Sequence, residues 1–126
     1  MRLNQVTVRV KDIKRAFEFY RNLGLIPIVA GTDHYARFLC PDGDSTFSIE
    51  LSRGETPHST TTVYFECEDL DKTVAELQAK GFHFTQGPVD QSWLWREAYL
   101  SDPDGNVICL FYAGENRINP PWRLKE

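Results

Sequence analysis

The sequence has little cysteine, no long apolar run and no excess of positive charge, and each shortage argues against a class of protein. Its three cysteines (Cys40, Cys67 and Cys109) form no CxxC pair, which favours reduced thiols in a cytoplasmic protein over a disulfide framework. A formal net charge of −4 argues against broad affinity for nucleic acid. No apolar run reaches the ~20 residues that span a bilayer, and residues 1–5 lead into a strand pattern instead of a signal peptide. We therefore expect neither a nucleic-acid partner nor a membrane partner.

The composition is otherwise that of an ordinary globular protein of 126 residues, with 41% hydrophobic and 13% aromatic residues. This length fits one domain, or two small modules that share a core. Aromatic residues either fill a core or line a pocket, and composition alone leaves both open.

The first half of the chain combines one helix with four strands. Val6, Val8 and Val10 alternate with polar residues, which predicts a strand over residues 3–10. Asp12 is typical of a helix N-cap and Gly24 of a helix end, and apolar residues recur at helical spacing between them. Further strand patterns cover residues 25–29, 35–39 and 46–51.

The pattern restarts after a polar stretch at residues 52–59, which predicts a linker. Asp69 and Gly81 repeat the cap and the helix end, each 57 positions after its counterpart. Strand patterns flank this second helix at residues 62–67, 82–85, 94–100 and 106–112. A spacing that holds through several elements indicates a duplicated unit. We therefore predict a first βαβββ module at 1–51, a linker at 52–59, a second module at 60–113 and a C-terminal tail at 114–126.

The tail contains Pro120, Pro121 and Trp122, which argue against further regular structure. An exposed Trp is costly, so we expect the tail to dock, either on its own module or over a pocket or a partner subunit.

Each module has a turn sequence before its last strand. Residues 41–43 read PDG, and residues 102–105 read DPDG. Proline presets one turn dihedral, aspartate bonds nearby backbone, and glycine takes the positive φ that other residues avoid. Both stretches therefore predict tight turns between paired strands.

With the repeat in register, the chain resembles the vicinal oxygen chelate superfamily. That group includes glyoxalase I, extradiol dioxygenases, fosfomycin- and bleomycin-resistance proteins and methylmalonyl-CoA epimerase. The resemblance lies in residues 3–12 (LNQVTVRVKD), 17–20 (FEFY), 49–51 (IEL) and 102–106 (DPDGN). It implies an α+β fold in which two tandem βαβββ modules form a curled, cup-like mixed sheet. One such fold hosts several chemistries, so the resemblance is specific for fold rather than activity.

The resemblance also implies places for one divalent metal ion, on the first and last strands of each module. Carried onto this sequence, the places are Gln5, Glu50, Thr62 and Cys109, with Glu50 and Cys109 as equivalent positions. Gln5 and Glu50 match what some glyoxalase-like members use, whereas Thr62 and Cys109 do not. A mixed amide, carboxylate and thiolate set is not typical of Zn²⁺, Fe²⁺ or Mn²⁺. Gln5 and Glu50 are therefore a hydrogen-bonded polar pair, direct ligand contacts, or metal ligands completed by water or a substrate oxygen.

Other candidates share the strand faces that the family's cup turns inward. Arg9 and Arg37 would meet an anionic ligand there, or form a solvated edge or structural ion pairs. Trp95 and Tyr99 would form an aromatic wall for a planar or carboxylated ligand, or divide between core and surface. The remaining ligand-binding candidates are Thr62, Tyr64 and Cys109.

Two functional classes follow from the resemblance. The departures at Thr62 and Cys109 favour a bleomycin-resistance-like protein that binds a small organic ligand without a complete metal site. The alternative is a metal-dependent lyase, isomerase or dioxygenase that uses Gln5 and Glu50. Glu50 would also suit a general base that removes a proton beside a carbonyl. Family members often pair, so a homodimer is the expected assembly.

Overall fold

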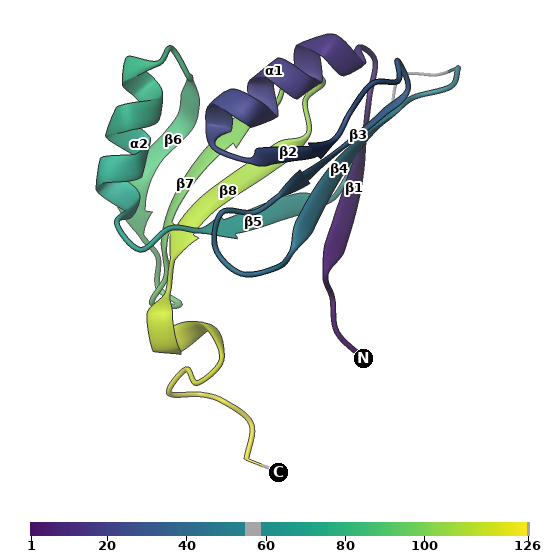
Figure 1. The fold of residues 1–126 in the computed structure, drawn as a ribbon. Helices are drawn as coiled ribbons and strands as arrows, with labels where there is room; N and C mark the ends of the chain where they lie inside the picture. Colours follow the sequence, from purple (N-terminus) through teal and green to yellow (C-terminus); the bar gives the residue numbers. More distant parts are fainter. Residues whose placement is uncertain (55–58, 126) are drawn as a thin grey trace. The chain divides into compact units, whose positions relative to one another are not determined.

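The computed structural model describes residues 1–54 and 59–125 (Figure 1). Residues 55–58, half of the linker predicted at 52–59, lie outside these described residues. The chain divides into two compact units, which we call unit 1 (Met1–Ser59 with Asp102–Asn106) and unit 2 (Thr60–Ser101 with Val107–Glu126). Within the described ranges, no helix has the length and apolar character needed to cross a membrane.

Unit 1 packs one helix on a four-stranded mixed sheet. Along the chain come β1 (Gln5–Val10), α1 (Ile13–Leu23), β2 (Ile26–Val29), β3 (Tyr35–Leu39) and β4 (Thr46–Leu51). The strand order is β1-β4-β3-β2, in which β1 and β4 are parallel and the other neighbours are antiparallel.

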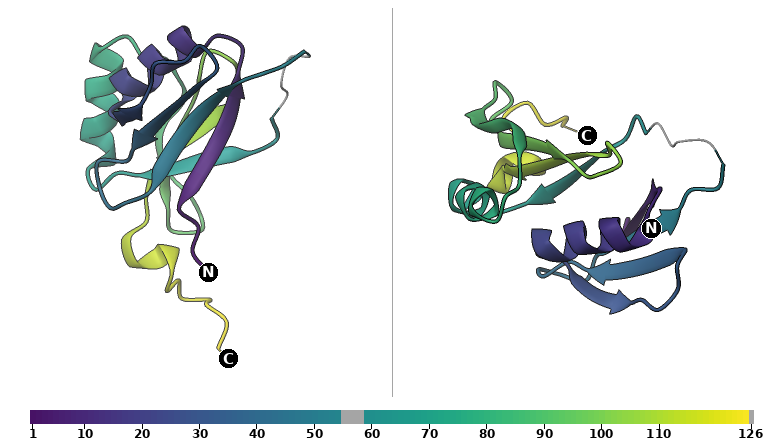
Figure 2. Two further views of the ribbon diagram at one scale, coloured as in Figure 1. Left: turned by 45° about the vertical axis from the view of Figure 1, so that its right-hand side comes forward. Right: turned by 90° about the horizontal axis from the view of Figure 1, so that it is seen from above.

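Unit 2 repeats this plan. Its elements are β5 (Thr62–Glu66), α2 (Leu70–Ala79), β6 (Phe84–Asp90), β7 (Arg96–Ser101), β8 (Val107–Tyr112) and the short 3₁₀ helix η1 (Gly114–Arg117). The strand order is β5-β8-β7-β6, again with one parallel pair, β5 and β8. The predicted α+β fold with two βαβββ modules is therefore confirmed, with each helix lying along one face of its own sheet (Figure 2).

The predicted helix caps act as the sequence indicates. The Asp12 side chain accepts a hydrogen bond from the Arg15 backbone N–H at 3.1 Å, and Asp69 accepts one from Lys72 at 3.2 Å. Gly24 ends α1 with a φ of 123°, a value that disfavours any residue with a Cβ. Local chemistry therefore sets where both helices begin and where the first one ends.

Each core lies between the helix and one face of its sheet. In unit 1 the ring of Tyr20 lies 4.6 Å from that of Phe47 and 6.2 Å from that of Phe38, all three fully buried. In unit 2 the corresponding core is aliphatic, with Leu70, Val74, Leu77, Leu100 and Ile108 buried. Because strand residues alternate between faces, the side chains on the other face of each sheet are free to form a site.

The strand predicted at residues 82–85 is longer in the structure. β6 continues to Asp90 through Gly87 and Pro88, and its pairing with β7 shifts register between Gln86 and Val89. Gly and Pro suggest a strand end in sequence, but an edge strand with an irregular pairing tolerates both.

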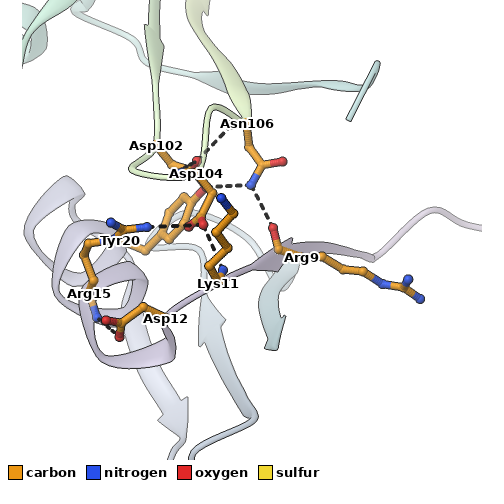
Figure 3. Close-up of polar contacts among 8 residues, drawn as sticks. All are labelled: Arg9, Lys11, Asp12, Arg15, Tyr20, Asp102, Asp104 and Asn106. Carbon is orange, nitrogen blue, oxygen red and sulfur yellow. Dashed lines mark hydrogen bonds and ion pairs between the residues drawn. The ribbon is translucent and has the colours of Figure 1, made fainter. Parts of the chain in front are cut away.

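The turn that precedes β8 packs with unit 1, whereas the sequence placed it inside the second module. The Tyr20 hydroxyl donates to Asp102 Oδ2 at 2.6 Å, in a buried contact (Figure 3). Burial and the Asp102 carboxylate raise the pKa of Tyr20 above its ordinary value. The turn thus delivers a carboxylate to a phenol that would otherwise be buried without a partner.

Two further residues of the turn complete this attachment. The Asp104 Oδ1 atom accepts from the Lys11 backbone N–H at 2.8 Å, and it pairs with the Arg15 guanidinium at 3.3 Å. The Asn106 side chain donates to the Arg9 carbonyl at 3.1 Å. The sequence DPDGN therefore serves as a long-range contact as well as a turn.

Candidate functional site

The face of the unit 1 sheet opposite α1 is polar. We call it the polar face: Gln5, Thr7, Arg9, Tyr35, Arg37, Thr46, Ser48 and Glu50. Strand pairing brings these residues together, because Thr7 lies opposite Ser48 in β4, and Ser48 lies opposite Arg37 in β3. The sequence predicts Arg9 and Arg37 on this face but misses Tyr35, which the two-residue period of β3 places beside Arg37.

Tyr35 and Ser48 link the middle of the polar face. The Arg37 Nε–H donates to the Tyr35 hydroxyl at 2.9 Å, and the hydroxyls of Thr7 and the fully buried Ser48 lie 2.5 Å apart. Burial opposes ionisation of Tyr35, but hydrogen bonds with Ser48 and Arg37 outweigh it and lower the pKa of Tyr35. Tyr35 is therefore held between a guanidinium and a buried hydroxyl.

Glu50 is not an isolated carboxylate. It is exposed and pairs with Arg9 at 3.6 Å, its register neighbour in β1. The isolation that would suit a general base is therefore missing, and one of the two sequence interpretations of Arg9, an ion pair, describes its contact here.

The corresponding face of unit 2 is aromatic. Trp95 stacks on Phe111 with 4.6 Å between ring centroids and 14° between planes, and Tyr64 meets both rings edge-on at 6.0 and 5.7 Å. Trp95 and Tyr99 pack against the buried group formed by Cys109, Phe111 and Ala113. We call Tyr64, Trp95, Tyr99, Cys109 and Phe111 the aromatic face. It unites four of the predicted ligand-binding residues and adds Phe111.

A buried carboxylate lies beside the aromatic face. Glu97 is 2% exposed, and its two oxygens accept from the Tyr99 hydroxyl at 2.9 Å and the Trp93 indole N–H at 3.0 Å. Burial and the bond to Glu97 raise the pKa of Tyr99. The sequence misses Glu97, although it lies two residues before Tyr99 on the same strand and hence on the same face.

The strand register corrects one predicted equivalence between the modules. Thr7 lies opposite Ser48, and Tyr64, 57 positions later, lies opposite Cys109. Ser48 and Cys109 are therefore equivalent, and both are fully buried. Glu50 corresponds instead to Phe111, because the loop before β8 shifts the register by two residues relative to the alignment of the short motifs.

The start of the tail packs on its own unit, and its later part exposes apolar side chains. Glu66 accepts from the backbone N–H groups of Ala113 and Gly114 at 2.9 and 3.0 Å, and the Trp95 indole donates to the Asn116 carbonyl at 3.4 Å. Trp122 is 57% exposed. Residues 113–116 therefore pack on unit 2 as expected, whereas Trp122 remains exposed to solvent.

A cavity of about 680 Å³ opens in unit 1 beside the first turn of α1, and Tyr35 of the polar face is among the residues that line it. Lys11, Lys14, Phe17 and Leu51 contribute to its lining, together with the loop before β3. The sequence did not predict it, since its shape depends on a loop conformation that no pattern reports.

Comparison with known proteins identifies the family. The sequence model of the Glyoxalase/Bleomycin resistance protein/Dioxygenase superfamily matches residues 2–110. The chain belongs to this superfamily. The resemblance predicted from the short motifs is thereby confirmed.

Members with this fold come from several organisms. The uncharacterized protein YraH of Bacillus subtilis (strain 168) is 30% identical over 127 residues, covering 88% of this chain and 98% of YraH. A glyoxalase/bleomycin resistance protein/dioxygenase from Nocardioides has a TM-score of 0.79 at 21% identity, covering 99% of this chain and 90% of that one. Lactoylglutathione lyase from Agrobacterium tumefaciens has a TM-score of 0.75 at 16% identity, covering 88% and 92%. The two structural likenesses show the fold alone.

The superfamily's metal places in unit 1 do not fit a shared ion. Gln5 lies opposite Thr46 and Glu50 opposite Arg9, four positions further along. At the rise of a β-strand this separation is about 13 Å, whereas donors to one ion each lie about 2 Å from it. Gln5 is also engaged, because its Oε1 accepts from the Thr46 hydroxyl at 2.8 Å.

The places in unit 2 fit no better. Burial raises the pKa of the Cys109 thiol to about 11, and its soft sulfur does not match the oxygen donors at the other places. Thr62 offers only a hydroxyl. In residues 1–54 and 59–125 no group of three His, Cys, Asp or Glu side chains could hold a metal ion. The donor set of this chain therefore does not match the metal site of its metal-dependent relatives.

Proposed function

We propose that the chain binds a small, planar organic molecule against the aromatic face of unit 2, without a resident metal ion. The observation that carries the proposal is the stack of Trp95 on Phe111 with Tyr64 edge-on to both. Tyr64 remains 48% exposed and Trp95 is half-buried, so these two rings are open to a ligand while the buried Phe111 supports them. Such a surface suits a flat ligand, because ring stacking adds about 0.5–1.5 kcal/mol to the burial of apolar area.

The polar groups near the aromatic face support binding rather than turnover. Both oxygens of Glu97 are occupied by Tyr99 and Trp93, and the Cys109 thiol is buried and protonated. These groups orient the rings without presenting a free base or nucleophile. The activity we propose is therefore capture of a ligand, in the manner of the bleomycin-resistance branch of the superfamily.

We further propose a cytoplasmic homodimer. None of the three cysteines takes part in a disulfide, which supports a reducing compartment. The exposed Trp122 in the tail supports contact with a partner subunit. Light scattering of the purified protein tests the dimer, and a monomer at micromolar concentration would contradict it.

A pair of matched probes tests ligand capture. Naphthalene-2-carboxamide is flat, and cyclohexanecarboxamide carries the same amide on a saturated ring. We expect the naphthyl probe to bind at least ten times more tightly by isothermal calorimetry, because only a flat ring stacks on Trp95 and Tyr64. Tyr64→Leu should weaken that binding at least fivefold, whereas Trp122→Leu, on the exposed tail, should leave it within twofold.

Equal affinity for the two probes, or unchanged naphthyl binding in Tyr64→Leu, would overturn the proposal. Tyr64 is half exposed, so its replacement should not disturb folding, and a thermal melt verifies this. Elemental analysis of protein purified without added metal tests the second part. Stoichiometric metal that disappears in Glu50→Ala would favour the metal-dependent enzyme instead.

A further inference from the structure

The polar face of unit 1 contains a guanidinium that is held in place but has no ion-pair partner among the described residues. Arg37 is half buried, and its Nε–H donates to the Tyr35 hydroxyl at 2.9 Å. Its guanidinium carbon lies 5.6 Å from the centre of the Tyr35 ring. These contacts engage one edge of the fork and leave the two terminal nitrogens, which are its bidentate donors, without a carboxylate within ion-pair distance in the described chain.

The charged side chains of the polar face add up to a net positive charge. Glu50 is its one carboxylate, and Arg9 pairs with it at 3.6 Å from the neighbouring strand. The two cancel, so Arg37 leaves the face with a net positive charge. The other named side chains of the face are uncharged.

Hydroxyl groups of the polar face lie around the contact between Arg37 and Tyr35. An arginine only donates, so the Tyr35 oxygen accepts from the Arg37 Nε–H at 2.9 Å. The hydroxyls of Ser48 and the exposed Thr7 lie 2.5 Å apart, and either of them can be the donor. A face that offers the terminal nitrogens of a guanidinium fork beside hydroxyl groups is complementary to an oxyanion.

We propose that the polar face is a carboxylate-binding subsite, in which the terminal nitrogens of Arg37 hold a ligand carboxylate. A single planar fork matches the two oxygens and single charge of a carboxylate. Tyr35 is a positioning residue, because it contacts the guanidinium rather than the ligand. The inference rests on the proposed function only in taking the ligand to be a small organic molecule, and it concerns unit 1 alone.

Side-chain NMR tests this subsite directly. The Arg37 Nε–H is hydrogen-bonded, so its ¹H–¹⁵N signal should be protected from exchange and observable. Benzoate should shift that signal with a millimolar dissociation constant, whereas benzamide, its neutral isostere, should not. Arg37→Gln should weaken benzoate binding at least tenfold, and Arg37→Lys, which keeps the charge but loses the fork, about threefold. Well-dispersed amide spectra verify that each variant is folded.

Arg21→Gln is the matched control. It removes the same charge from unit 1, but at a site on α1 where Arg21 pairs with Glu18 at 2.6 Å. Benzoate affinity in this variant should stay within twofold of the original. Equal loss in Arg21→Gln and Arg37→Gln, or equal response to benzoate and benzamide, would overturn the subsite. Because the naphthyl carboxamide probe is neutral, its binding to unit 2 can fail while benzoate binding to unit 1 persists, and the reverse.

Discussion

The two modules share one backbone plan and carry different chemistry at equivalent positions. In unit 1, Arg37 donates to Tyr35, two residues earlier on the same strand. In unit 2, Tyr99 donates to Glu97, again two residues earlier on the corresponding strand. The spacing of donor and acceptor is the same in both pairs, but their charges differ. The pair in unit 1 has a cationic donor, Arg37, whereas the pair in unit 2 has an anionic acceptor, Glu97. Duplicated strands thus supply fixed places, and the side chain at each place decides which ligand group the face can meet.

The turns before the last strands differ as strongly. Residues 41–45 in the first module are exposed. In the second module Asp102 and Asn106 are buried, and the Asp104 side chain is fully enclosed against unit 1. Similar turn chemistry therefore has a local role in one module and a long-range role in the other.

The largest expected difference in stability is between variants at Phe111 and at its equivalent position, Glu50. Phe111→Ala removes a buried ring that stacks on Trp95, and we expect it to lower the free energy of unfolding by about 3–5 kcal/mol. Glu50→Ala removes an exposed ion pair with Arg9, for which the expected change is at most about 0.5 kcal/mol. Urea denaturation measures both. Similar losses in the two variants would break the contrast between the faces.

The turns should differ by a smaller amount. Asp102→Ala leaves the buried Tyr20 hydroxyl without its acceptor and removes the partner of the Asn106 side chain, so we expect a loss of about 2–3 kcal/mol. Asp42→Ala, in the exposed turn of the first module, should change stability by less than about 0.5 kcal/mol. The same denaturation series tests the pair, and an unaffected Asp102→Ala variant would show that the turn contributes nothing beyond its own geometry.

The repeated elements were predictable because the interactions that form them join residues close together in the sequence. Asp12 and Asp69 cap their helices through the next turn of the same helix, so a constant spacing of 57 positions was enough to find both. The equivalence of Glu50 and Cys109 failed for the opposite reason. Residues 49–51 (IEL) resemble 108–110 (ICL), but the loops set the strand register, and the register pairs Glu50 with the place of Phe111.

The alternation of strand side chains between two faces was enough to predict part of the site. Tyr64 and Trp95 were found as aromatic candidates, whereas Glu97 was missed because a lone Glu in a strand is usually solvated. Glu97 is nevertheless buried and accepts from the indole of Trp93, a loop residue whose position no strand pattern predicts. Similarly, no pattern within Asp102–Asn106 indicates that Tyr20, far earlier in the chain, is its partner.

The smallest expected effect is the pH dependence that this partnership creates. The pKa of Tyr20 is raised, so the folded state keeps its phenol protonated, while in the unfolded chain the phenol ionises at about 10. The resulting stability is fully present below pH 10 and is lost as pH rises further, by up to about 1.4 kcal/mol per pH unit. Tyr20→Phe should therefore lose less stability than the original protein between pH 9 and pH 11, by about 1 kcal/mol. Chemical denaturation at the two pH values measures the difference, and parallel losses in the original protein and Tyr20→Phe would mean that the Asp102 turn does not hold the phenol in solution.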